Sequence, residues 1–419
     1  MANEVDPLFL AVLQPVLRGA AGEPLSLQPA PRTAASPLGR PGEWRAQRLA
    51  PALRERLRWC LAHSAPHDPT PWWAGHDRIF VLVDGHRPLT IQPQHPWVAD
   101  GPPADAPYPA VLALRAGGLL LFFVNASIAP DGSARACVRV FAVDGQQAVE
   151  ADPVPDVQLF DAWAADGAVW ACGMRSRHTD ASGTGHFGHG VLLRFAMRPL
   201  ALAEQLGGAQ WLDVSPAAGV SEQTLRDRVQ GIEAWLAHAQ DGQGGHWLLG
   251  APLAPLHFSP DSPLWLPGPL TPSDHADLVL ARWQPGRPPL MEALVSSLRW
   301  VAGCRSSEPA AARWYLARGG LQRLGHLVVG DLVALSPAPQ AEALLGEPQP
   351  LRIEGLPRSA LDRTLADLDV IHDPRFGYAA SLSWLLPDTP GRLMPAAEGV
   401  LMRSGDGVRW EVVQETAGA

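Results

Sequence analysis

Three acidic residues recur at matching places in apolar, strand-like segments: Asp161, Glu233 and Glu292. Each segment leads into a Trp-x-x-Gly sequence. If the three segments face one axis, their carboxylates converge, and glycoside hydrolysis needs two carboxylates about 5–10 Å apart. These acids are therefore the candidate catalytic residues if the protein is an enzyme. The alternative is the ordinary alternation of polar and apolar side chains on a half-exposed strand.

A second candidate site is the Gly-rich segment 177–190, which is predicted to be a loop between two strands. Imidazole and carboxylate groups suit Zn²⁺ or another borderline divalent metal, so its three histidines and one aspartate are a candidate metal site. The spacing of the last two histidines matches no metal motif, and a ligand-contacting loop is favoured over a metal centre. A solvated loop is the remaining alternative. The candidate ligand-binding residues are Arg177, His178, Asp180, His186 and His189, and the candidate metal ligands are His178, Asp180, His186 and His189.

The adjacent Trp72 and Trp73 are candidate ligand-binding residues as well. Neighbouring residues of an extended segment face opposite ways, so one ring is free to bind a sugar or a partner protein. The favoured alternative is that the pair fixes an N-terminal helix to the first sheet.

The segments that carry the acids have the pattern of β-hairpins. In the clearest one, apolar runs flank the turn Asp166-Gly167, and Asp-Gly between two such runs is a strong hairpin signal. The pattern returns at intervals of some tens of residues, and each hairpin is followed by a variable loop and a further strand. This repetition predicts the four-stranded meander of a propeller blade.

The sequence thus predicts an all-β protein, a β-propeller of five or six four-stranded blades. Five units begin near residues 107, 156, 228, 290 and 366, with a sixth near 72. A β-sandwich with long insertions is the alternative. Short helical insertions are expected where apolar residues show helical spacing, at 221–232, 341–345 and 359–368.

Residues 1–65 differ from the rest and form a separate predicted unit, an N-terminal helical arm with a Pro-rich link, before a propeller at 66–419. Apolar residues at helical spacing between Ala50 and His63 predict an amphipathic helix. We expect the arm to cap the propeller or dock on it; a partly ordered tail is the alternative.

One turn carries a family resemblance. The segment Ser404-Gly405-Asp406-Gly407-Val408-Arg409-Trp410 resembles the Asp-box turn of sialidase-type propellers. The resemblance covers seven residues and implies fold, not activity. The basic triad of sialidases cannot be placed in the chain, and only Tyr108, Tyr315 and Tyr378 are available as the tyrosine nucleophile, so sialidase activity is not expected.

Composition limits the function classes. The 419 residues are 47% hydrophobic and 18% charged, as in a globular protein, and a net charge of −9 disfavours nucleic acid or anionic lipid as partner. The four cysteines are isolated and form no disulfide framework, and no secretory signal is recognised at the N-terminus. A soluble cytoplasmic protein without membrane contact is the expectation.

The main functional prediction is a non-catalytic interaction module that binds a partner protein or a small ligand on its ring face. It needs no cofactor. A glycosidase-like hydrolase using the acids of the repeated hairpins is the first alternative, and a metal-dependent enzyme built on the 177–190 segment is the second.

Overall fold

The structure is a computed structural model, and it describes most residues between 72 and 412. The described ranges are 72–74, 79–83, 87–97, 111–144, 147–175, 178–179, 185–186, 189–197, 200–208, 211–214, 231–241, 244–252, 277–296, 298–304, 311–318, 327–336, 347–373, 377–385 and 397–412. The predicted N-terminal arm (1–65) and the predicted helix at 341–345 lie outside these ranges.

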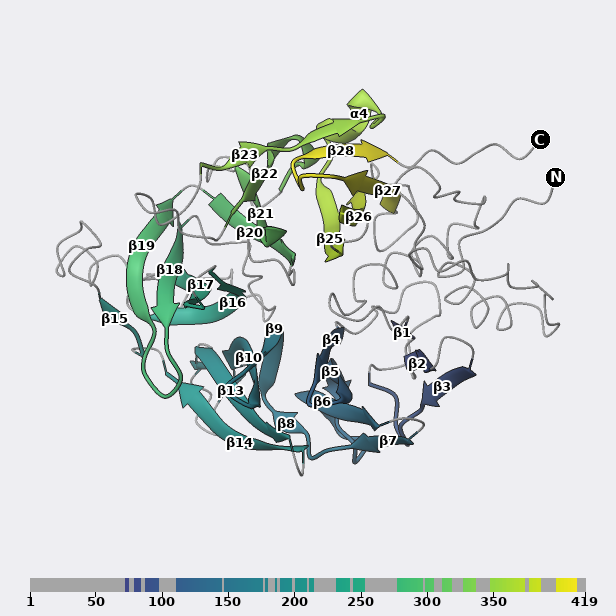
Figure 1. The fold of residues 1–419 in the computed structure, drawn as a ribbon, viewed down its shortest axis with the longest axis vertical. Coiled ribbons are helices and arrows are strands. Elements are labelled where there is room, and N and C mark those ends of the chain that lie inside the picture. Colours follow the sequence, from purple (N-terminus) through teal and green to yellow (C-terminus); the bar gives the residue numbers. More distant parts are fainter. Residues whose placement is uncertain are drawn as a thin grey trace.

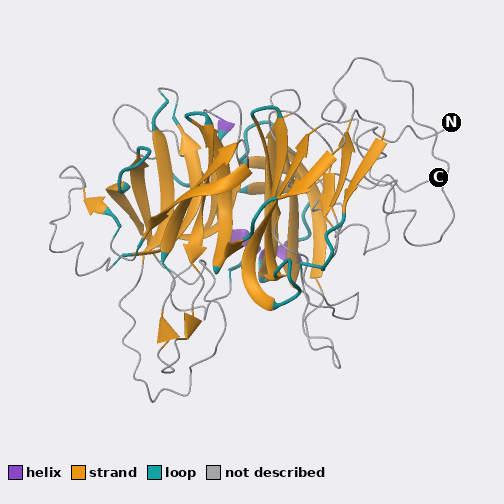
Figure 2. Cartoon of the chain, turned by 90° about the horizontal axis from the view of Figure 1, so that it is seen from below, coloured by secondary structure: helices purple, strands orange, loops and turns teal. Residues whose placement is uncertain are grey.

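The described chain forms consecutive antiparallel sheets arranged around an axis (Figure 1). Within the described residues, blades 2 to 6 have four or five strands each, and blade 1 has three. Seen from the side, the strands run between the two faces of the ring (Figure 2). This is the predicted all-β propeller.

The strands of the first three blades follow chain order. Blade 1 contains β1 (Trp72–Ala74), β2 (Ile79–Val83) and β3 (Arg87–Ile91); blade 2 contains β4 (Val111–Ala116), β5 (Leu119–Ile128), β6 (Ala134–Asp144), β7 (Gln147–Glu150) and β8 (Val154–Pro155); blade 3 contains β9 (Val157–Ala165), β10 (Ala168–Arg175), β13 (Gly190–Met197) and β14 (Leu200–Gly207). A separate two-strand ribbon, β11 (His178–Thr179) and β12 (Gly185–His186), is inserted between β10 and β13.

The last three blades repeat the meander, and blades 4 and 6 add a parallel outer strand that precedes the inner strand in the chain. Blade 4 contains β15 (Asp213–Val214), β16 (Ile232–Gln240), β17 (His246–Pro252), β18 (Asp277–Trp283) and β19 (Leu290–Ser296); blade 5 contains β20 (Leu298–Cys304), β21 (Arg313–Arg318), β22 (Leu332–Leu335) and β23 (Gln349–Pro350); blade 6 contains β24 (Arg352–Glu354), β25 (Leu365–Asp373), β26 (Gly377–Leu385), β27 (Ala397–Ser404) and β28 (Arg409–Val412). The described part of the chain contains two short helices, η5 (Val329–Asp331) and α4 (Arg358–Leu361). Among the described residues, no helix is long and apolar enough to span a bilayer.

The hydrophobic core of the described residues is divided into five clusters between consecutive blades, and the cluster between blades 4 and 5 also includes Met174 of blade 3. Blades 2 to 5 therefore bury both faces, which is why their strands are almost continuously apolar. The predicted inter-blade tryptophans lie here: Trp163, Trp170 and Trp235 between blades 3 and 4, and Trp247 between blades 4 and 5, with the partly buried Trp300 packed against it.

The inner strands β4, β9, β16, β20 and β25 surround the centre of the ring (Figure 1). Contacts show that β9 and β16 run in the same direction. Gly190 is opposite Met174 of β10, and Met174 is opposite Gln158 near the N-terminal end of β9. Gly190 also lies against Ile232 at the start of β16. Near the other end, the ring of Trp163 stacks on that of His238. The end of β10 and the start of β13 therefore lie at the N-terminal end of the inner strands.

Two predicted element boundaries were wrong. The segment 290–303 is not one hairpin, because β19 is the outer part of blade 4 and β20 is the inner strand of blade 5. The predicted helix 359–368 is helical only in α4, and its second half belongs to β25. The predicted helix 221–232 lies outside the described residues up to residue 230, and Ile232 begins β16.

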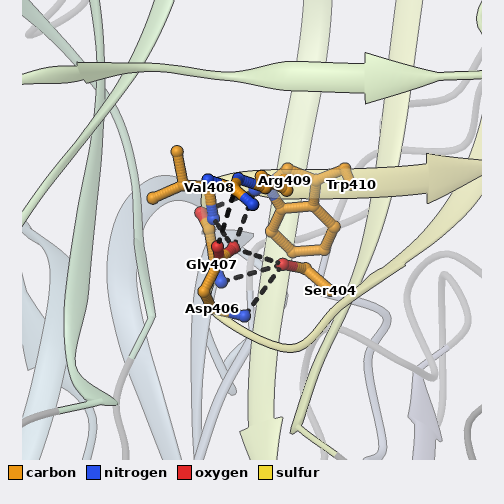
Figure 3. Close-up of polar contacts among 6 residues, drawn as sticks. All are labelled: Ser404, Asp406, Gly407, Val408, Arg409 and Trp410. Carbon is orange, nitrogen blue, oxygen red and sulfur yellow. Dashed lines mark hydrogen bonds and ion pairs between the residues drawn. The ribbon is translucent and has the colours of Figure 1, made fainter.

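The turn between β27 and β28 is fixed by its own polar groups (Figure 3). The Ser404 hydroxyl accepts hydrogen bonds from the N–H groups of Asp406 and Gly407, at 3.2 and 2.8 Å. Asp406 Oδ1 accepts the N–H groups of Val408 and Arg409, both at 2.8 Å. These hydrogen bonds stabilise one hairpin turn. They do not show that the protein is related to sialidases.

Candidate functional site

Asp161 lies in the middle of β9, directly after a β-bulge. The pairing with β10 skips Phe160, because Cys172 is opposite Asp161 and Gly173 is opposite Leu159. A bulge turns the next side chain away from the regular alternation. The result is a carboxylate that is 6% exposed, on an inner strand.

The carboxylate of Asp161 connects two blades. Its Oδ1 accepts the N–H of Ala162 at 2.8 Å, and its Oδ2 accepts the N–H of His238, in β16 of blade 4, at 2.8 Å. Both oxygens thus have backbone donors, which stabilises the charged form of a buried carboxyl group.

Glu233 is itself the extra residue of a bulge, at the start of β16. Ile232 is opposite Pro252 and Ala234 is opposite Ala251, so the strand register skips Glu233. It is 5% exposed. Asp161 and Glu233 thus lie on neighbouring inner strands, and the predicted convergence of their carboxylates stays a prediction. Glu233 lies closer to the N-terminal end, because Asp161 is level with His238, five residues further along β16.

Glu292 does not belong to this site, and the prediction that grouped it with the other two acids was wrong. It lies on β19, away from the inner strand of blade 4. Its buried carboxylate forms an ion pair with Arg282 on β18. Arg282 also lies over the ring of Trp247, with its Cζ 5.9 Å from the centroid. Glu292 therefore has a structural role within blade 4.

A third inner strand carries acids that the sequence analysis missed. In β25 of blade 6, Asp367 follows a bulge at Ala366, because Leu365 is opposite Trp384 and Asp367 is opposite Ser383. The available signal was the alternation of acidic and apolar residues in 367–370, which was hidden by the helix predicted over its first part.

The predicted metal and ligand loop is only partly described. Arg177 and Asp180 lie outside the described residues. His178 and His186 are opposite each other in the ribbon β11–β12, and the carbonyl of His189 accepts the N–H of Arg175 at 2.8 Å. Within the described ranges, no group of three or more His, Cys, Asp or Glu residues is arranged to hold a metal ion. A metal site in this loop and a ligand-contacting role both stay predictions.

Trp72 and Trp73 form β1 with Ala74 and are opposite Val81 and Phe80 of β2. They are thus part of the first sheet and not of a free segment. Their predicted roles in binding a ligand or in fixing the N-terminal arm stay predictions.

Comparisons with known proteins returned structural matches alone. No family model and no curated protein matches the chain. Among solved structures, a GH43 protein from Bacillus licheniformis matches at 8% identity and a TM-score of 0.36, over 74% of this chain and 55% of its own length. A levansucrase from B. megaterium matches at 10% identity and a TM-score of 0.37, over 74% of this chain and 86% of its own. A GH43 β-1,3-galactosidase matches at 8% identity and a TM-score of 0.39, over 73% and 94%. Identities this low carry no statement about substrate or reaction.

Proposed function

We propose that the chain is a carbohydrate-active propeller of the glycoside hydrolase kind, with its reaction centre on the axis at the N-terminal half of the inner strands. One observation carries the proposal. On three inner strands, in blades 3, 4 and 6, an acidic residue occupies a β-bulge or directly follows one. Bulges often accompany active sites because they redirect a side chain.

Glu233 is the proposed proton donor. A glycosidase protonates the leaving oxygen with one carboxylic acid while a second carboxylate acts from the other side of the sugar ring. Asp367, placed by its strand position in blade 6, is the proposed second carboxylate. Asp161 is held by two backbone N–H groups, so it supplies a fixed negative charge that suits the positive charge developing on the sugar.

The test is hydrolysis of a panel of oligosaccharides and nitrophenyl glycosides by the purified protein and by Glu233→Gln. We expect turnover of at least one glycoside by the wild type and a loss of about 10²–10⁴-fold in the variant. The loss should be larger on oligosaccharides than on nitrophenyl glycosides, because a nitrophenolate leaves without protonation.

The matched control is Glu292→Gln, which removes the charge of a buried acid in the same blade but away from the axis. It should retain most of the wild-type turnover. Equal activity of Glu233→Gln and wild type, or no turnover of any glycoside, would refute the proposal. The latter result would leave the non-catalytic interaction module as the working hypothesis.

A further inference from the structure

The backbone of β9 in blade 3 is held from blade 2 by one asparagine side chain. The NH₂ group of Asn125 donates a hydrogen bond to the carbonyl of Leu159 at 2.8 Å, and the side-chain oxygen of Asn125 accepts the N–H of Leu159 at 2.9 Å. These two bonds define the orientation of the amide, because a backbone N–H only donates and a carbonyl only accepts. Asn125 lies on β5 and is half-buried, so one side chain joins two blades at two points.

The contact reproduces a pair of an antiparallel ladder. In blade 3, β10 occupies one edge of β9, and within the described residues no strand pairs with the other edge. A residue of a strand directs its N–H and its carbonyl to the same edge, and those of Leu159 are directed away from β10 toward blade 2. The amide of Asn125 offers them one acceptor and one donor, as an opposite residue of a ladder would.

The place of Asn125 in blade 2 explains how its side chain reaches β9. The inner strands β4 and β9 are neighbours in the ring (Figure 1). The ladder between β4 and β5 begins with the pair Val111–Val124, and Asn125 is the next residue of β5. No residue of β4 is therefore opposite Asn125, and its side chain passes the N-terminal end of β4 to contact blade 3.

The residue that Asn125 holds is the last one before the bulge that precedes Asp161. Leu159 is in register with β10, Phe160 is the extra residue, and Asp161 follows it. Asp161 then accepts the N–H of His238, on β16 of blade 4, at 2.8 Å. A shift of Leu159 would therefore move the carboxylate that binds blade 4.

We propose that Asn125 is a positioning residue for Asp161. Its two hydrogen bonds hold β9 beside the bulge and thereby fix the carboxylate of Asp161 relative to Glu233 on β16. The ladder with β10 is interrupted at the bulge, so this ladder alone leaves the following residue less constrained than in a regular strand. Asn125 supports β9 from the opposite edge. The consequence for catalysis rests on the proposed function, whereas the support of Asp161 does not.

Amide hydrogen exchange, resolved to single residues, tests this support without any substrate. In the wild type, the N–H of Leu159 should exchange as slowly as the ladder amides of β10, although it is directed away from β10. In Asn125→Ala, exchange of the N–H of His238 should rise several-fold relative to the amides of β26 in blade 6. Asn125 and His238 lie two blades apart, so such a rise reports movement of Asp161. Global destabilisation would affect both sets of amides and is removed by the ratio.

Asn125→Asp is a second variant of nearly the same size. Its carboxylate accepts the N–H of Leu159 but has no proton to donate to the carbonyl at neutral pH, so the exchange ratio should rise here as well. The matched control is Gln205→Glu. It makes the same exchange of an amide for a carboxylate at an exposed position on β14 of blade 3, and it should behave as the wild type.

Turnover measures the consequence for the proposed reaction. On a glycoside that the wild type hydrolyses, Asn125→Ala and Asn125→Asp should lower kcat about 10–10²-fold with little change in KM, because a misplacement of about 1 Å has an effect of this size. A purely structural role would lower the amount of folded protein and leave kcat per folded molecule unchanged. Gln205→Glu should keep the wild-type kcat.

Rapid exchange of the Leu159 N–H in the wild type would overturn the proposal, whether or not the variants fold. An unchanged ratio of His238 to β26 exchange in a folded variant would show that Asn125 does not position Asp161. Wild-type kcat in both variants would contradict the catalytic consequence. If the protein hydrolyses no glycoside, the exchange results still decide whether Asn125 supports Asp161, and the proposed reaction alone fails.

Discussion

Buried carboxylates are held in two ways in this protein. Asp161 is held by backbone N–H groups from two blades, and Glu292 by the guanidinium of Arg282 within one blade. A backbone donor cannot move aside, whereas Arg282 is half exposed and flexible. The two acids should therefore respond differently when their charge is removed.

Asp161→Asn should lower the free energy of unfolding by about 1–3 kcal/mol. The side-chain amide offers one oxygen where two N–H groups need acceptors, and its NH₂ group would face a backbone donor. Urea unfolding at pH 7.5 measures the change. Glu292→Gln keeps an acceptor for Arg282 and should cost less; an equal or larger cost would contradict the roles assigned to the two acids.

The sequence located two of the candidate acids and misplaced the third for a physical reason. Asp161 and Glu233 precede Asp-Gly turns, which mark the end of an inner strand. Glu292 has no such turn after it. Because blades bury both faces, inner and outer strands have the same apolar composition, and composition alone could not show that the chain changes blade after Ser296.

At the level of elements, β-bulges interrupt the inner strands β9, β16 and β25, and a glycine makes the bulge in β9 possible. A Cβ atom on Gly173, opposite the bulge in β9, would lie 2.0 Å from the carbonyl oxygen of Gln158. No side chain fits there without moving the backbone beside Asp161.

Gly173→Ala should therefore destabilise the protein by about 1–3 kcal/mol, measured by urea unfolding. If the proposed reaction is correct, the variant should also lose activity, because β9 moves relative to β16. A Cβ atom on Gly208, at the outer edge of the same blade, would meet no atom within 4 Å. Gly208→Ala should therefore change neither the free energy of unfolding nor the activity. Similar stability of the two variants would show that the bulge is not constrained by Gly173.

Bulges also explain an error in the elements predicted from sequence. Leu365 and Leu368 are three residues apart, which suggested a helix. In β25 both leucines face the core between blades 5 and 6. Residues on one face of a regular strand are two positions apart, and the extra residue Ala366 of the bulge increases this spacing to three. Tight turns were easier: the hairpin predicted at Asp166-Gly167 is confirmed, with positive φ angles of 51° and 69°.

At the scale of the whole molecule, each inter-blade core depends on its two neighbouring blades. Opening one blade exposes apolar surface on both of its sides, so the blades should unfold together despite their repeat character. The sequence predicted the propeller class because its hairpin signal is local. Which strand belongs to which blade depends on contacts between distant segments.

A variant far from blade 3 tests this cooperativity. The buried hydroxyl of Tyr315 in blade 5 donates a hydrogen bond to the carbonyl of Gly407 in blade 6, at 3.1 Å. Burial raises the pKa of Tyr315 well above its ordinary value, so the hydroxyl remains a donor at neutral pH. Tyr315→Phe should cost about 1 kcal/mol.

Tyr315→Phe and Gly173→Ala should shift one common transition, seen at the same urea concentration by circular dichroism and by tryptophan fluorescence. Separate transitions for the two probes would mean that blades 3 and 5 unfold independently.

The parallel outer strands of blades 4 and 6 have a consequence for synthesis on the ribosome. Asp213 of β15 pairs with Leu290 of β19, and Arg352 of β24 pairs with Arg409 of β28, so each outer strand emerges before every other strand of its blade. It must wait until the last strand of that blade has been translated. The outer strands of blades 4 and 6 therefore join their sheets last, although their residues are synthesised first.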